Sequence, residues 1–293
     1  MNEREIIAKK VGIFGITGNI FLFIIKIIIG IICNSKAMIA DSINSAGDVF
    51  ASFMTWLGSR ISSAPSDDDH NFGHGKAEYV FSMIIGISMM VIALKLLYDS
   101  FISIINHSMV TYSIFLIIIS VITIVIKICL YYFCRCSLKK YDNLLVKSNM
   151  LDHRNDIIVT SFTMLATILS KYGIYWFDGV VGVGISIWIF ITSIMIYRES
   201  YDVLMDRAID NESKNKIINI LNSYTTVKKI GLIHSVPVGY NYIIVLTIYV
   251  DGRMNTSSSH KIADEIEEKI RKDIKRVEDV FIHVEPFSKK NHK

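Results

Sequence analysis

The chain has 293 residues, of which 52% are hydrophobic and 20% are charged, and its formal net charge is +4. Most of the charges lie outside a few long apolar runs. This distribution excludes an ordinary water-soluble globular protein and predicts a polytopic protein of the lipid bilayer with a soluble appendage. The first ten residues are polar and lack a signal-peptide cleavage pattern, so we expect the first apolar run to be a retained span.

Six runs are long enough to cross a hydrocarbon core of about 30 Å. We place these spans near residues 11–32, 37–60, 78–100, 112–133, 145–170 and 174–197. The second and fifth are less apolar than the others, which fits helices shielded inside a bundle. Lys and Arg gather in the N-terminal tail and in the links that follow spans two and four, so the positive-inside rule predicts cytoplasmic termini.

The composition changes near Asp206, which divides the chain into a six-span domain of residues 1–205 and a soluble domain of residues 206–293. In the second part, residues 212–223 and 256–273 have helical periodicity, and Ser or Thr near residue 256 can cap the second helix. Residues 227–235, 240–250 and 278–285 are rich in strand-forming residues. This order predicts a small α+β domain with an antiparallel pair in its sheet and helices on one face.

Two pairs of polar residues interrupt the less apolar spans. Asn44 and Asp48 lie in span two, and Asp152 and Asp156 lie in span five. The i, i+4 spacing puts each pair on one helix face, about 6 Å apart along the axis. Carboxylates inside a bilayer are costly and usually mark an ion or proton path, so the two pairs predict a four-oxygen cage for a divalent cation. Asp41 shares the face of Asp48, and we interpret it as a supporting residue, with direct ligation as the alternative.

Two carboxylates about 4 Å apart repel each other by about 4 kcal/mol at an effective dielectric constant of 20. We therefore expect at least one of the three cage acids to hold a proton in the absence of metal, and a divalent cation to displace it. The alternative is that the acids form ion pairs with Lys26, Lys95 or Lys127 of other spans. His153 follows Asp152 but lies about 100° around the helix, so we expect it to point away from the cage.

A third segment, residues 67–78, has the form D-x-x-H-x-x-G-H-G-K-x-E. Together with the two polar pairs, the six spans and the α+β domain, it resembles the cation diffusion facilitator family over nearly the whole chain. The resemblance implies a homodimeric secondary transporter of the cell membrane, in bacteria the inner membrane, with a cytoplasmic ferredoxin-like domain that serves dimerisation and regulation. It implies exchange of divalent metal for protons, with no cofactor, no enzymatic activity and no nucleic-acid partner. The transport site implied is Asn44, Asp48, Asp152 and Asp156.

The cage departs from that of the zinc-type members, which resemble one another in placing His there. Asn44 and Asp152 make this cage all oxygen. Zn²⁺ favours nitrogen and sulfur, whereas Mn²⁺ accepts carboxylate and carbonyl oxygen. The chain therefore resembles the manganese-exporting branch, with Fe²⁺ and Zn²⁺ as alternative cargoes.

The resemblance also implies secondary sites. In the loop, Asp67, His70 and His74 match a second metal site, in which the two His can chelate if the segment is locally helical; a solvated polar loop is the alternative. In the soluble domain the matching positions are His234, His260, His283 and Glu285, although Thr247 stands where a bridging His is expected, so plain surface residues are the alternative. Lys76 and Asp206 match a charge pair that in the family clamps the membrane and cytoplasmic domains together, and the alternative is an exposed ion pair.

Two other function classes fit the residues less well. An intramembrane metalloenzyme needs an activated water and usually an H-E-x-x-H pair, and the sequence has no such motif. A metal-sensing membrane signalling protein needs an output domain, and the soluble part has no phosphate loop or catalytic signature.

Overall fold

The computed structural model describes residues 3–32, 36–105, 114–174 and 176–287, and within these ranges the side chains of residues 36–41, 43 and 178 are not described. The chain forms two compact units. One consists of Met1–Pro65 and Ala77–Tyr201, and the other of Ser66–Lys76 and Asp202–Lys293. The loop between the second and third helices thus belongs to the C-terminal unit. The change in composition near Asp206 places this loop in the six-span domain of residues 1–205.

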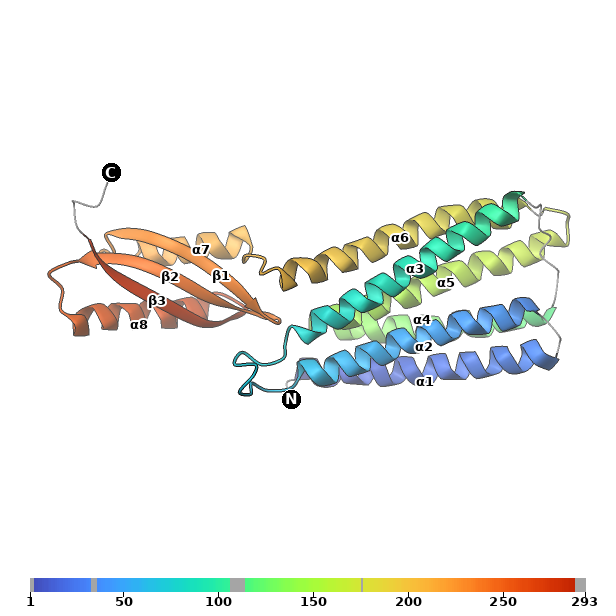
Figure 1. Cartoon of the computed structure of the whole chain (residues 1–293), viewed down its shortest axis with the longest axis horizontal. Helices are drawn as coiled ribbons and strands as arrows, with labels where there is room; N and C mark the ends of the chain where they lie inside the picture. Colours follow the sequence, from blue (N-terminus) through green and yellow to red (C-terminus); the bar gives the residue numbers. More distant parts are fainter. Residues whose placement is uncertain (1–2, 33–35, 106–113, 175, 288–293) are drawn as a thin grey trace. The chain divides into compact units, whose positions relative to one another are not determined.

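The first unit is a bundle of six long helices that lie side by side (Figure 1). They are α1 (Glu3–Ile32), α2 (Lys36–Ser62), α3 (Ala77–Ile105), α4 (Ile114–Leu138), α5 (Leu144–Ser170) and α6 (Trp176–Leu204). Each helix coincides with one predicted span. Most extend beyond it by several residues, because the helical hydrogen bonds continue into polar sequence that hydropathy does not register.

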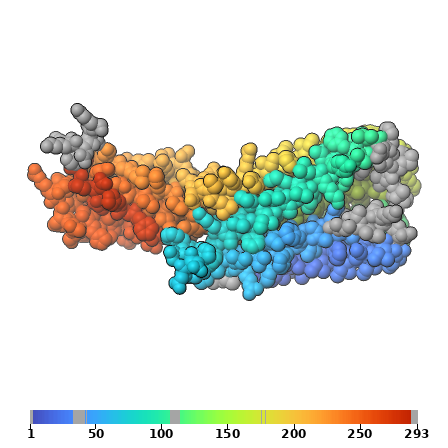
Figure 2. Space-filling view, viewed as in Figure 1, coloured from blue at the N-terminus to red at the C-terminus, as the bar shows by residue number. Residues whose placement is uncertain are grey.

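Four of these helices are apolar and long enough to cross a membrane: Glu3–Ile32, Ala77–Ile105, Ile114–Leu138 and the Gly179–Leu204 part of α6. The other two, α2 and α5, are the more polar helices that carry the predicted cage. The polar side chains of α2 are buried within the bundle at Ser42, Ser45, Ser52, Thr55 and Ser59, while the apolar helices expose large hydrophobic side chains such as Phe21, Val91 and Phe115. The polar helices are thus shielded by neighbours, as expected. Figure 2 shows α2 and α3 side by side on one face of the bundle.

Small residues let α1 approach α2 closely. A Cβ added at Gly12 would lie 2.7 Å from backbone atoms of Trp56, so only glycine allows this contact. Two turns further along α1, the buried Asn19 amide donates to the backbone oxygen of Asp48 at 3.1 Å and to Ser52 Oγ at 3.0 Å. These contacts fix the segment of α2 that carries the cage residues.

Glu78, the last residue of the loop motif, is 1% exposed and joins three helices. Its carboxylate accepts from Arg4 Nη2 of α1 at 2.7 Å and from the backbone N–H of Leu144, the first residue of α5, at 2.7 Å. The Asn143 side chain caps the same helix by accepting from the N–H of Val146. A negative charge at this helix end is favourable, so Glu78 sets where α5 begins.

The C-terminal unit is a three-stranded sheet with two helices. Its elements are α7 (Asn211–Asn222), β1 (Lys229–Val238), β2 (Asn241–Asp251), α8 (Thr256–Asp273) and β3 (Val277–Phe287). β1 and β2 form an antiparallel hairpin, and β3 pairs parallel to β2 after the crossover through α8. This is the α+β arrangement that the order of elements predicts. The cap of α8 differs from expectation: Asn255, not Ser or Thr, accepts from the N–H of Ser258, because it is the residue directly before the first turn.

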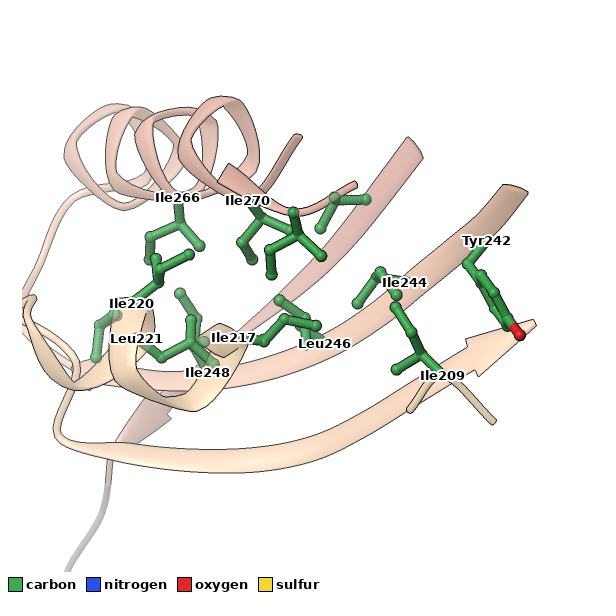
Figure 3. Close-up of a cluster of buried hydrophobic side chains, with 13 residues drawn as sticks. Ile209, Ile217, Ile220, Leu221, Tyr242, Ile244, Leu246, Ile248, Ile266 and Ile270 are labelled. Carbon is green, nitrogen blue, oxygen red and sulfur yellow. The ribbon is translucent and has the colours of Figure 1, made fainter. Parts of the chain in front are cut away.

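Both helices cover the same face of the sheet and form one hydrophobic core with it (Figure 3). The buried side chains come from α7, alternate positions of β2, and α8: Ile217, Ile220, Leu221, Ile244, Leu246, Ile248, Ile266 and Ile270. Residues of the opposite parity in the strands, among them His234, Phe281 and His283, stay exposed. The period of two in β2 and of about four in α8 therefore accounts for the fold of this unit.

We predict that Glu78→Ala destabilises the bundle by about 3 kcal/mol or more, because it leaves Arg4 and the N–H of Leu144 without their carboxylate in a buried place. Thermal unfolding of the full-length protein in detergent measures the effect. Glu199→Ala is the matched control: its ion pair with Lys147 is 2.6 Å long but 43% exposed on the Glu199 side, so the expected loss is under about 1 kcal/mol. Equal losses in the two variants would contradict the role given to Glu78.

Candidate metal centre

The four cage residues predicted from the sequence line one cavity of about 130 Å³ within the bundle. Asn44 and Asp48 reach it from α2, and Asp152 and Asp156 reach it from α5. Side chains of α3 and α4, including Met89 and Thr123, complete its wall. The cavity therefore has carboxylate and amide oxygens on two helices, which is the donor set that Mg²⁺, Ca²⁺ and Mn²⁺ prefer.

A lysine from a fourth helix also enters the cage. Lys127 of α4 is 1% exposed, and its Nζ lies 2.7 Å from Asp48 Oδ2 and 2.5 Å from Asp156 Oδ2. The alternative considered above, an ion pair between the cage acids and an intramembrane lysine, is thus realised for two of the three acids. The ammonium group offsets the repulsion between these carboxylates. From Asn44, Asp48, Asp152 and Asp156 alone, we expect a bound proton to offset it.

His153 is closer to the cage than its position on the helical wheel suggested. It is 1% exposed, and one of its ring nitrogens lies within 4.8 Å of the ligand oxygens of Asp152 and Asp156. Its Nδ1 has no hydrogen-bond partner among the described residues. His153 is not among the residues that line the cavity, so its pointing away from the cage stays a prediction. The oxygen cage has a nitrogen beside it.

A buried hydrogen bond holds α5 against α2 next to the cage. Asn149 Nδ2 donates to Thr55 Oγ1 at 2.7 Å, and both side chains are buried. Asn149 lies one turn before Asp152, and Thr55 lies two turns after Asp48, so this bond connects the two helices that supply all four cage residues. The side chain of Asp41, the predicted supporting residue, lies outside the described residues.

The loop triad Asp67, His70 and His74 also comes together. Ligand atoms of the three residues lie within 4.8 Å of one another, with Asp67 3.2 Å from His70 Nδ1 and 3.5 Å from His74 Nε2. The segment is not helical, contrary to the geometry expected for chelation. Instead, the N–H of His70 donates to Asp67 Oδ1 at 2.6 Å, and Gly73 adopts a φ of 72°, which turns the chain back.

The charge of the triad favours a cation. The backbone N–H of His70, which donates to the Asp67 carboxylate, holds the pKa of that group below its ordinary value. Asp67 thus remains ionised well below neutral pH, next to two imidazoles.

This loop packs against the β1–β2 turn of its own unit, where a Cβ on Gly75 would lie 3.0 Å from the Cα of Gly239.

Lys76 and Asp206 form the ion pair that the resemblance implied, with Nζ 2.7 Å from Oδ1. The side chains are 41% and 56% exposed, so the pair is weak by itself. It joins the loop to the segment that follows α6, both of which belong to the C-terminal unit.

Comparison with known proteins agrees with this geometry. The model of the cation efflux transmembrane domain matches residues 13–205, which is most of the chain, and the model of the cation efflux protein cytoplasmic domain matches residues 209–287. The chain belongs to the cation efflux family. The matches cover the helical bundle and the sheet domain separately, as the two compact units do.

Curated members of the cation efflux family match the chain over nearly its full length. The manganese efflux system protein MneP of Bacillus subtilis is 29% identical over 98% of each chain. The magnetosome protein MamB of Magnetospirillum gryphiswaldense is 26% identical over 92% of this chain and 91% of its own. The cation-efflux pump FieF of Shewanella oneidensis is 26% identical, with 90% and 89% covered.

The soluble-domain positions suggested by the family resemblance do not converge within one chain. His283 and Glu285 are neighbours on the exposed face of β3, with Nε2 3.3 Å from Oε1, and Thr247 pairs with His283 across the sheet. His234 also lies on that face, in β1, but His260 lies on α8 and pairs with Asp264 at 3.6 Å. Among the described residues, ligand atoms of three His, Cys, Asp or Glu side chains lie within 4.8 Å of one another in the loop triad and in the cluster of Asp152, His153 and Asp156.

We predict that Thr55→Val destabilises the protein by about 1–3 kcal/mol, because the buried Asn149 amide loses its acceptor. Thr167→Val is the matched control on α5, since the Thr167 hydroxyl donates only to the Thr163 backbone oxygen of its own helix, and its expected loss is under about 1 kcal/mol. Thermal unfolding in detergent measures both. A loss in Thr55→Val no larger than in the control would mean that this bond does not hold α2 to α5.

Proposed function

We propose that this cation efflux protein exports a divalent metal ion, with Mn²⁺ as the preferred cargo, in exchange for protons. The observation that carries the proposal is the ammonium group of Lys127, which two carboxylates of the cage hold at 2.7 and 2.5 Å inside the membrane domain. A site that binds one cation from two helices has the geometry to bind another. The cavity is lined by four acids, Asp48, Asp99, Asp152 and Asp156, and by three lysines, Lys26, Lys95 and Lys127, so the acids are in excess and favour a further cation.

Proton exchange follows from the same count of charges. When the metal leaves, carboxylates without a balancing cation are costly inside a membrane, so protons from the other side of the membrane replace the metal on them. The exchange then keeps the cage close to neutral in both states. We assign Asn44, Asp48, Asp152 and Asp156 as the transport site on this basis.

The preference for Mn²⁺ rests on the donor atoms. The four side chains offer only oxygen, which suits Mn²⁺ better than Zn²⁺, and MneP, whose name describes manganese efflux, is similar over the whole length. His153 supports the second candidate, efflux of Fe²⁺ or Zn²⁺, because its nitrogen lies within reach of the acids. FieF is a relative of comparable identity whose name leaves the cation open.

The remaining assignments concern topology and assembly. We propose a multi-pass protein of the cell membrane with cytoplasmic termini, because Lys and Arg concentrate on the side of the N-terminus. The similarity to the family's cytoplasmic domain supports a homodimer in which His234, His260, His283 and Glu285 contribute to the contact. The loop triad would bind a second metal ion, and the Lys76–Asp206 pair would hold the loop to the segment that follows α6.

Reconstitution into proteoliposomes tests the transport proposal. We predict that the wild type moves Mn²⁺ when a pH gradient is imposed and that Asp156→Ala reduces this flux to the level of empty liposomes, because the cage loses a ligand and a proton acceptor. Asp69→Ala, an exposed loop acid, is the control and should retain the wild-type flux. Flux that does not depend on the pH gradient would rule out antiport, and full activity of Asp156→Ala would rule out the site.

Selectivity is tested by exchanging single ligands. We predict that Asp152→His raises the ratio of Zn²⁺ to Mn²⁺ transport by about tenfold, since it adds the nitrogen that Zn²⁺ prefers. His153→Gln should leave the ratio and the Mn²⁺ flux near wild-type values if the oxygen cage alone holds the metal. Loss of transport in His153→Gln would instead make this imidazole a ligand and favour Fe²⁺ or Zn²⁺ as the cargo.

A further inference from the structure

Lys127 contacts two of the cage acids although it lies on neither of the helices that carry the cage. It projects from α4, is 1% exposed, and bridges Asp48 of α2 and Asp156 of α5. A lysine buried this deeply in a bundle needs partners of opposite charge. The partners here are the same oxygens that the proposed function assigns to the metal.

The ammonium and the metal cannot hold these oxygens at the same time. A divalent first-row ion binds carboxylate oxygens at about 2.0–2.2 Å, and the Lys127 Nζ already lies 2.7 and 2.5 Å from one oxygen of each acid. An ion placed between the two carboxylates would lie against Nζ, with like charges and overlapping volumes. Either the metal binds elsewhere, or Lys127 leaves when the metal arrives.

Other acids in the cavity can accept the Lys127 ammonium group after it leaves Asp48 and Asp156. The same cavity is lined by Asp152 and by Asp99 of α3, an acid outside the predicted quartet. Thr123, one turn before Lys127 on α4, also faces the cavity. A lysine side chain has four rotatable carbons and a compact head group, so it can change partners without moving its helix.

We propose that Lys127 is a tethered counter-cation, which fills the transport site when it is empty, is displaced when metal binds, and returns when metal leaves. This inference rests on the proposed function. Competition with Lys127 lowers the apparent affinity for metal, because only the fraction of molecules with the lysine displaced can bind. The return of Lys127 also favours release of the metal, because the carboxylates exchange one cation for another and their negative charges stay compensated. Lys127 is thus a positioning residue that sets affinity and release and is not a ligand.

The opposite reading is a permanent ion pair that only holds α2, α4 and α5 together. The two readings predict opposite changes in metal affinity when the charge of Lys127 is removed. A competing cation weakens metal binding, so its removal tightens it. A structural brace keeps the ligands in place, so its removal weakens binding.

The experiment titrates full-length protein in detergent with MnCl₂ and follows free Mn²⁺ by electron paramagnetic resonance. We expect Lys127→Met, which keeps the length of the side chain and removes the charge, to bind Mn²⁺ about tenfold or more tightly than the wild type. Its Mn²⁺ flux in proteoliposomes should fall, because release becomes slow. Lys127→Arg should stay within about threefold of the wild-type affinity, since it keeps the charge. Lys147→Met removes a lysine whose ion pair with Glu199 lies outside the cavity and should leave the affinity unchanged.

Equal or weaker Mn²⁺ binding by folded Lys127→Met overturns the inference and leaves Lys127 as a structural partner. If this variant is unstable without metal, it is purified with Mn²⁺, and the rise in unfolding temperature on adding Mn²⁺ is compared with that of the wild type. A larger rise supports displacement, and an equal or smaller one contradicts it. A wild type that neither binds nor moves Mn²⁺, Fe²⁺ or Zn²⁺ removes the proposed function, and this inference with it, whereas metal binding with no difference between variants removes this inference alone.

Discussion

Carboxylates inside a membrane bundle are stable only when a positive charge or a proton accompanies them, and the central part of this protein is arranged around that requirement. Asp48 and Asp156 come from two different helices and meet at the ammonium group of a third. The same requirement explains why α2 and α5 are the shielded, polar helices, and why a buried amide–hydroxyl bond between Asn149 and Thr55 fixes them to each other. In this structure the cation between Asp48 and Asp156 is the ammonium group of Lys127.

Function follows when that cation can be exchanged. In the proposed antiport, the site holds an ammonium group, a metal ion or protons in turn, and transport consists of moving between these states. The glycine contact between α1 and α2 and the Glu78 anchor at the start of α5 hold the rest of the bundle firmly. Side-chain exchange within the cavity can then occur without disrupting the helices that form it.

Much of this arrangement can be predicted from the sequence. Six apolar or partly apolar runs give six helices, and the periodicity of residues 206–293 gives the sheet domain, because both patterns report which face is buried. The i, i+4 spacing correctly brings Asn44, Asp48, Asp152 and Asp156 to one cavity. The partner of the acids is harder to predict: Lys26, Lys95 and Lys127 all line the cavity, and sequence spacing does not show that the Lys127 ammonium lies 2.7 and 2.5 Å from Asp48 and Asp156.

Contacts that depend on the length of side chains and on loop turns are also hard to predict from the sequence. A helical wheel describes Cβ directions and does not show that a nitrogen of the long His153 ring lies within 4.8 Å of the ligand oxygens of Asp152 and Asp156. The loop triad forms by a turn at Gly73, which spacing alone does not distinguish from a helix. Glu78 belongs to the loop motif and yet serves the bundle, and sequence spacing contains no signal for its partners Arg4 and Leu144, which are distant along the chain.

The most direct measurement is the position of the metal itself. Anomalous X-ray scattering at the manganese edge, from crystals of the full-length protein grown with Mn²⁺, locates the ion and shows Lys127 in the same map. Our account predicts a peak between Asp48 and Asp156, coordinated by Asn44 and Asp152 as well, with the Lys127 ammonium withdrawn from both acids. A peak in the loop triad alone, with Lys127 still bridging Asp48 and Asp156, would contradict it.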